Sequence, residues 1–143
     1  MRVLVAVDLT DEDAEAFVAR AVEWAGALGA TLDLLFVDEA ADENPYILDG
    51  QLRATMSVHY EAWHAQMRER LAQVVRDLPD AVRGEGTVVR GRAAAVVAER
   101  LDGYDAAVVG NRPVTGLARL MHGVVAERVV SQSHIPVIIL PRG

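Results

Sequence analysis

Five short apolar runs alternate with longer segments of helical periodicity, and this alternation constrains the fold of the 143-residue chain more than any other feature. The first run, residues 3–7, is continuous and rich in Val, which is typical of a strand buried on both faces of a parallel sheet. The other runs lie at residues 31–37, 87–89, 104–109 and 136–140. Between them, apolar residues recur every three or four positions, which predicts helices at residues 17–28, 52–78, 93–101 and 117–129.

This order of elements predicts an α/β fold. Strands that alternate with helices form an open parallel sheet through right-handed crossovers, so we expect five parallel strands with helices on both faces. The length is that of a single domain, and we assign residues 1–143 to it. Thr10 followed by Asp13 predicts a capping box at the start of the first helix.

Charge and residue usage exclude several classes of function. The net charge of −7 makes nucleic acid or an anionic membrane surface a poor partner. The chain contains no Cys, and all 14 basic residues are Arg, so thiolate chemistry and lysine-dependent phosphoryl transfer are excluded. No run approaches the roughly 20 apolar residues that span a bilayer. The apolar run at residues 3–7 is too short for the core of a signal peptide, so we expect a cytoplasmic protein.

The carboxyl ends of the predicted strands are where a ligand is expected, because open α/β sheets bind ligands at that edge. The residues at these ends include Asp8, Val37, Arg90 and Gly110. The loop at residues 110–116 leads into the last predicted helix, whose free N–H groups can face a phosphate. The sequence therefore predicts a binding site formed by these strand ends.

Four segments of the chain resemble the universal stress protein family. They are VAVD ending at Asp8, YDAAVVGNR at residues 104–112, GVVAERVV at residues 123–130, and HIPVIILP at residues 134–141. The resemblance covers nearly the whole chain. It implies a Rossmann-like fold with strand order 3-2-1-4-5, and usually a dimer.

Many members of that family bind ATP through a loop that reads Gly, two residues, Gly, nine residues, Gly, and then Ser or Thr. Gly110 and Gly123 match the first and third glycines, but Pro113 stands at the second and Val124 at the hydroxyl position. Proline lacks an N–H and has a restricted φ, and Val124 has no hydroxyl. These departures predict weakened or lost binding of a triphosphate.

The resemblance also implies which residues meet a bound adenine nucleotide. Asp8 would contact the adenosine part and Val37 the base, while Arg112 offers a positive charge to phosphate. The full set that it implies is Asp8, Val37, Val109, Gly110, Arg112, Gly123, Val124 and Val125. Acids are concentrated at residues 8–15 and 38–49, so an unaccompanied polyphosphate would be repelled. The ligand stays open at this point: ATP or AMP, with or without Mg²⁺, or no nucleotide.

Each of these residues also has a purely structural interpretation. Asp8 can cap the following turn, Gly110 and Gly123 can serve packing, and Arg112 can be a solvated loop residue. His59 and His64 are five positions apart rather than the four of a helical zinc pair, so both are expected at the surface. We predict neither a metal ligand nor a catalytic residue.

The function favoured by these observations is a non-enzymatic stress-response or regulatory protein with an altered nucleotide site. We expect a homodimer formed through the C-terminal strand, because Val137 to Leu140 would be an apolar strand at the sheet edge. One alternative is an ATP- or AMP-binding sensor, or a slow ATPase, that tolerates Pro113 and Val124. Another is an unrelated doubly wound enzyme, which the lack of Lys, Cys and a paired catalytic constellation disfavours.

Overall fold

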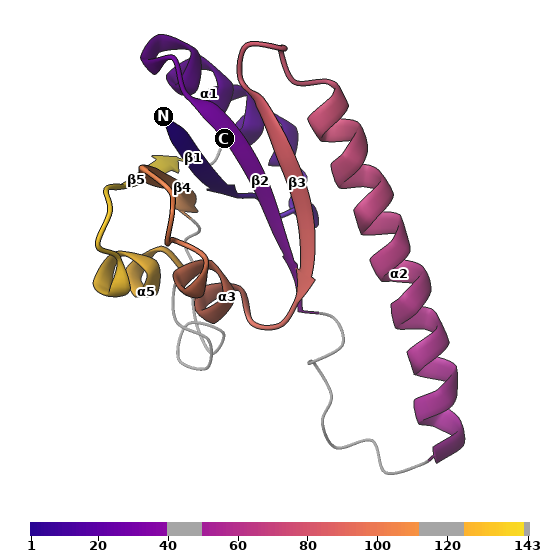
Figure 1. The fold of residues 1–143 in the computed structure, drawn as a ribbon. Coiled ribbons are helices and arrows are strands. Elements are labelled where there is room, and N and C mark those ends of the chain that lie inside the picture. The colour runs from indigo at the N-terminus through magenta and orange to yellow at the C-terminus, as the bar shows by residue number, and fades with distance from the viewer. Residues whose placement is uncertain (40–49, 112–124, 142–143) are drawn as a thin grey trace.

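The computed structural model describes residues 1–39, 50–111 and 125–141, with side chains at 1–39, 55–110 and 125–141, and confirms the predicted α/β architecture (Figure 1). Within these ranges the chain forms a five-stranded parallel sheet in the order β3-β2-β1-β4-β5. The strands are β1 Arg2–Ala6, β2 Thr31–Asp38, β3 Arg83–Arg90, β4 Ala106–Asn111 and β5 Val137–Pro141. The helices are α1 Ala14–Leu28, α2 Gly50–Arg76, α3 Ala93–Glu99 and α5 Val125–Gln132. The predicted start of the last helix, at residues 117–124, lies outside the described residues.

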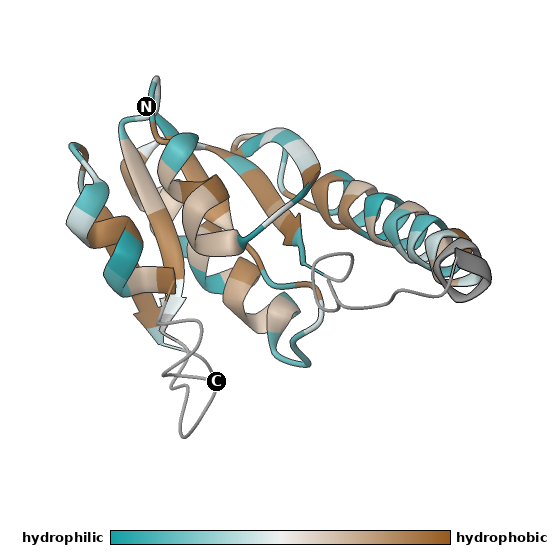
Figure 2. Ribbon diagram, turned by 90° about the horizontal axis from the view of Figure 1, so that it is seen from below, coloured by the Kyte–Doolittle hydropathy of each residue, from teal (hydrophilic) through white to brown (hydrophobic). Residues whose placement is uncertain are grey.

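Helices cover both faces of the sheet, as the alternation of elements predicts. Val3 and Val5 of β1 pack into a core shared with α1 and α2, whereas Leu4 joins a second core shared with α3 and α5. The brown, apolar strands lie between the helices in Figure 2. Strand β1 is therefore buried on both faces, which explains why its sequence is a continuous apolar run rather than an alternating one.

Helix α2 is much longer than the strands beside it, and its first turns extend beyond the carboxyl ends of β2 and β3 (Figure 1). Met67 and Leu71 are buried in the core, and Trp63 packs against the same cluster. These three residues therefore mark the side of α2 that faces the core. No helix in the described parts of the chain is both long and apolar enough to cross a membrane.

Strand β3 departs most from the sequence prediction. The apolar run predicts a strand only at residues 87–89, but the strand begins at Arg83. Its first half passes so close to β2 that a Cβ on Gly84 would overlap the carbonyl oxygen of Leu32 and Oδ1 of Asp33. The β2–β3 register shifts between Leu32 and Leu34, beside this contact. Close backbone approach, rather than strand propensity, explains a glycine in this half of the strand.

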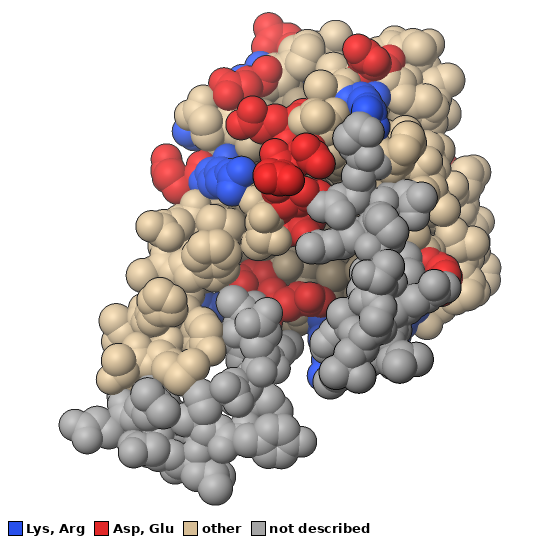
Figure 3. Space-filling view, turned by 180° about the vertical axis from the view of Figure 1, so that it is seen from behind, with Lys and Arg blue, Asp and Glu red and all other residues tan. Residues whose placement is uncertain are grey.

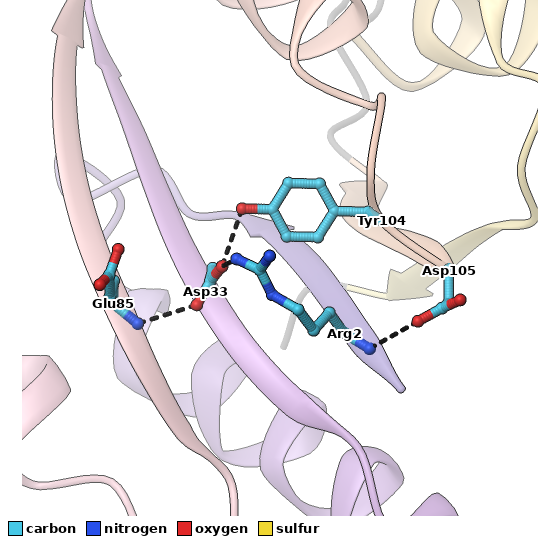
Figure 4. A network of polar contacts seen from close by, with 5 residues as sticks. All are labelled: Arg2, Asp33, Glu85, Tyr104 and Asp105. Atoms are coloured by element: carbon cyan, nitrogen blue, oxygen red, sulfur yellow. Dashed lines mark hydrogen bonds and ion pairs between the residues drawn. The ribbon is translucent and has the colours of Figure 1, made fainter.

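A buried carboxylate ties the amino ends of four strands together (Figure 4). Asp33 of β2 is only 7% exposed and accepts three hydrogen bonds. The donors are the backbone N–H of Glu85 in β3 (2.8 Å), the Arg2 guanidinium at the start of β1 (2.6 Å) and the Tyr104 hydroxyl just before β4 (2.8 Å). The backbone N–H of Arg2 donates in turn to Asp105 Oδ2 (2.7 Å).

These contacts shift the pKa values of the groups involved. Burial alone raises the pKa of Asp33, but the hydrogen bonds from Glu85, Arg2 and Tyr104 outweigh it, so the pKa lies below its ordinary value. Burial, together with the hydrogen bond to Asp33, raises the pKa of Tyr104. The charged form of Asp33 is therefore stabilised in the folded chain.

The contact at Gly84 predicts opposite effects for two glycine-to-alanine substitutions. Gly84→Ala forces a methyl group against β2 and is expected to lower the free energy of unfolding by about 1–3 kcal/mol. Gly26→Ala lies within α1 with no atom within 4 Å of the added Cβ, and is expected to raise it by about 0.5–1 kcal/mol. Urea unfolding of both variants measures the difference, and equal effects would contradict the close approach of β2 and β3.

The lowered pKa of Asp33 predicts a pH-dependent contribution to stability. The folded pKa lies below the unfolded value of about 3.9, so the charged carboxylate stabilises the fold above that pH and the contribution is lost as the pH falls through the folded value. Asp33→Asn is expected to lower the free energy of unfolding by about 1–3 kcal/mol at pH 7. Denaturant unfolding between pH 7 and pH 3 should show the difference from wild type shrinking in acid. Exposed Asp102→Asn is the matched control, and a constant difference for Asp33→Asn would refute the assignment.

Candidate functional site

A cavity of about 520 Å³ lies where the central strands end, on the edge of the sheet that the sequence predicts for a ligand. Strand β1 is flanked by β2 on one side and β4 on the other, so the chain changes direction across the sheet at this point. Such a switch point opens a crevice at the carboxyl ends of the strands. The lining residues are Ala6, Val7, Asp8, Thr10, Asp11, Ala14, Phe17, Leu35, Phe36, Val37, Asp38, Glu39, Trp63, Ala93, Val97, Val109, Gly110 and Val125.

Five of the residues that the resemblance implies for nucleotide contact are brought together in this cavity. Asp8 follows β1, Val37 belongs to β2, Val109 and Gly110 belong to β4, and Val125 begins α5. Their placement on one cavity confirms that Asp8 and Gly110 share the carboxyl edge of the sheet.

The remaining residues of that set lie outside the described part of the chain. They are Arg112, Gly123 and Val124, and Pro113 lies there as well. The interpretation of the loop as an altered phosphate site therefore stays a prediction from the sequence.

Asp8 organises the turn that leads from β1 to α1. Its Oδ1 accepts hydrogen bonds from the backbone N–H (3.0 Å) and the hydroxyl (2.6 Å) of Thr10. The predicted capping box is wrong, because Asp13 precedes the helix without a side-chain capping bond, and the Thr10 hydroxyl faces Asp8 instead. A carboxylate two residues before the hydroxyl forms a local turn that competes with the cap. Asp8 thus caps the turn after β1 and also lines the cavity.

Helix α2 forms a wall beside the cavity and is fastened to the ends of the strands. Glu61 pairs with Arg90 at the end of β3 (2.7 Å), and Arg70 donates to the carbonyl oxygen of Leu9 (2.6 Å). Trp63 lies between these contacts in sequence and lines the cavity. The position of the wall is therefore set by polar contacts as well as by the apolar core.

The most buried acid in the cavity is one that the sequence prediction missed. Asp38, the last residue of β2, is 3% exposed, and its Oδ2 lies 3.0 Å from Nδ1 of His64. The expectation that His64 lies at the surface is wrong, because its side chain is 16% exposed, whereas His59 is exposed. An acid placed directly after the apolar run of residues 31–37 is the signal that could have found Asp38.

The charge of the described lining is entirely negative. Its ionisable residues are Asp8, Asp11, Asp38 and Glu39, and no Arg belongs to it. Glu39 accepts a hydrogen bond from the backbone N–H of Ala93 at the start of α3 (2.6 Å). Figure 3 shows acidic side chains gathered on one face of the molecule, with fewer basic ones.

These features determine what the cavity can do chemically. Its apolar walls suit a flat ring, and its carboxylates accept hydrogen bonds from hydroxyl or amino groups. Within residues 1–39, 50–111 and 125–141, no group of three His, Cys, Asp or Glu residues is placed to hold a metal ion.

Comparison with known proteins identifies a family whose sequence model matches this chain. The sequence model described as "Universal stress protein family" matches residues 1–141. No curated protein matches the chain.

Several solved structures share the fold. A universal stress protein in complex with cAMP has a TM-score of 0.67 at 20% identity, over 99% of this chain and 96% of that one. The universal stress protein UspA from Lactobacillus plantarum has a TM-score of 0.66 at 22% identity, over 98% and 97% of the two chains. Hypothetical protein MJ0577 has a TM-score of 0.72 at 18% identity, over 99% and 96%. At these identities the likeness shows the fold alone.

Proposed function

Since the chain belongs to the universal stress protein family, we propose that it is a non-enzymatic stress-response protein that regulates by binding, as a dimer with an altered adenine-nucleotide site. The observation that carries this proposal is the cavity at the carboxyl ends of β1, β2 and β4. The sequence supports a binding role rather than a catalytic one, because it lacks Lys, Cys and a recognisable catalytic constellation.

The cavity supports an adenine-type ligand through its shape and its walls. Val37, Val109 and Val125 supply apolar surface from two strands and a helix, and Asp8 supplies a hydrogen-bond acceptor beside them. A relative with the same fold is in complex with cAMP, which supports the same class of ligand here. We assign the adenosine part of the ligand to this described region.

The phosphate part of the site is where this chain departs from its family. Pro113 lacks an N–H, and Val124 lacks a hydroxyl, at the two positions where the resemblance implies contacts to phosphate. The four acids in the described lining add like charges near the same ligand. We therefore propose weak triphosphate binding that improves with a divalent ion.

An ATP- or AMP-binding sensor, or a slow ATPase, is the alternative that the cavity also supports. It requires the loop to bind phosphate despite Pro113 and Val124. Native mass spectrometry of freshly purified protein separates the two proposals, because a nucleotide that copurifies at full occupancy favours the sensor.

The two edge strands support a dimer through β5 rather than β3. Strand β3 carries Arg83, Glu85 and Arg90, and charged residues protect an edge from pairing. Strand β5 reads VIILP, and its Ile139 is 46% exposed. An apolar edge of this kind is suited to pairing with a second copy.

A dimer through β5 predicts that a charge at Ile139 dissociates it. Ile138, the neighbouring residue, packs against the core, so Ile139→Lys tests the edge with less damage to the fold. We expect wild type to be a dimer at micromolar concentration and Ile139→Lys to be a monomer with an unchanged circular dichroism spectrum. Static light scattering measures both. Val58→Lys, at a 72% exposed position on α2, is the control and should stay dimeric. A monomeric wild type would refute the dimer.

The loop departures predict that two substitutions restore ATP binding. Pro113→Gly with Val124→Ser returns one backbone donor and one hydroxyl. A net hydrogen bond is worth about 0.5–1.5 kcal/mol, and one to a charged group about 1.5–3 kcal/mol. At about 1.4 kcal/mol per decade, we expect ATP affinity to rise by roughly one to four decades. Titration calorimetry with and without Mg²⁺ measures the change.

A matched control uses the same residue types away from the loop. Pro79→Gly with Val58→Ser replaces two exposed residues, one after the end of α2 and one on its surface, and should leave ATP binding unchanged. Tight ATP binding by wild type would show that the loop departures do not matter. No gain in the Pro113 and Val124 variant would show that phosphate binding is lost for another reason.

A further inference from the structure

We propose that Asp38, held in place by His64, is a specificity-determining residue that makes the cavity select the uncharged nucleoside over its phosphorylated forms. This inference rests on the proposed function, because it specifies the ligand class of the same cavity. Its evidence is separate from the loop at residues 110–124, since it depends on two side chains contributed by β2 and α2.

The backbone directs the Asp38 side chain toward α2. Successive residues of a strand point to opposite faces, and Val37 packs into the core on the α3 and α5 side. Asp38 therefore points to the other face, where its carboxylate meets His64. Its carbonyl oxygen accepts a hydrogen bond from the N–H of Gly91 (3.2 Å), which holds the end of the strand.

His64 fixes the orientation of this carboxylate. A carboxylate oxygen accepts hydrogen bonds, so Nδ1 of His64 donates to Oδ2 of Asp38 across 3.0 Å. The helix that carries His64 is itself held by the Glu61–Arg90 ion pair one turn away. A carboxylate accepts up to about four hydrogen bonds, so Asp38 can keep its partners within the fold and accept from a ligand at the same time. His64 is thus a positioning residue, and the ligand need not order the acceptor itself.

A little-exposed carboxylate discriminates between ligands by charge. Ribose hydroxyls and amino groups donate to it, and hydrogen bonds to a charged group are the stronger kind. A phosphate attached to a nucleoside brings negative charge to a cavity whose described ionisable residues, Asp38, Asp8, Asp11 and Glu39, are all acids, and like charges repel. The described walls therefore favour an uncharged nucleoside such as adenosine.

The test compares affinities for adenosine, AMP and ATP without Mg²⁺ by titration calorimetry. We expect wild type to bind adenosine at least tenfold more tightly than AMP, and AMP more tightly than ATP. Asp38→Asn keeps the shape and a hydrogen-bond acceptor for His64 but removes the charge. The substitution should weaken adenosine binding about tenfold, because the charged acceptor is lost. It should change AMP binding little, because the weaker hydrogen bond to the nucleoside is offset by weaker repulsion of the phosphate. The preference for adenosine over AMP should therefore collapse.

His64→Gln tests the positioning role through the same ratio of affinities. It should reduce the preference for adenosine several-fold, since the carboxylate is present but no longer oriented by the ring. The controls are His59→Gln, at an exposed position on the same helix, and Asp102→Asn, at an exposed position outside the cavity. Both should keep the wild-type ratio. Loss of stability alone would weaken all three ligands equally and would not move it.

The outcomes separate this inference from the proposed function. If wild type binds none of the three ligands, both fail. If it binds them but prefers ATP without Mg²⁺, or if Asp38→Asn and His64→Gln keep the wild-type ratio, the inference fails while nucleotide binding stands. Should Asp38→Asn not fold by circular dichroism, an unchanged ratio in His64→Gln overturns the inference by itself.

Discussion

Strand β1 pairs in parallel with β2 on one side and with β4 on the other, and this central position organises both the sheet and the cavity. Val3 and Val5 are buried on one face of β1 and Leu4 on the other, so the strand must be covered on both faces. Strands β2 and β3 lie on one side of β1, and β4 and β5 lie on the other side. This switch in strand order opens the cavity between the ends of the central strands, and α1, α2, α3 and α5 close its sides.

Two buried acids near opposite ends of β2 show how the surroundings assign different roles to one residue type. Asp33 is held at the amino ends of the strands by Arg2, Tyr104 and the Glu85 N–H, so it is enclosed in a stabilising network. Asp38 lies at the carboxyl end, where its partner His64 comes from α2 and the cavity begins. Asp33 therefore stabilises the fold through its donors, whereas Asp38 borders the cavity and is the residue that we propose meets a ligand.

Local patterns predicted most elements correctly and failed where a partner distant in sequence decided the outcome. The apolar runs and helical periodicity located all five strands and the described helices, because they record which faces are buried. The first half of β3 was missed because it contains Gly84 and charged residues, and it forms against β2. The capping box at Thr10 was wrong because Asp8 is the nearer acceptor. His64 was placed at the surface because its spacing from His59 carries no information about Asp38.

The α/β class, the parallel sheet and the edge at which a ligand is expected follow from the sequence alone, because burial pattern and the order of elements are local properties of the chain. The sequence also carries the motifs that resemble the universal stress protein family, and with them the implied strand order. Which acids are buried, and which residues hold them, depends instead on how the elements pack in three dimensions. Asp38 and His64 are 26 residues apart and meet because α2 crosses back over the end of β2. A contact of that kind depends on how two elements pack, and neither periodicity nor residue spacing encodes it.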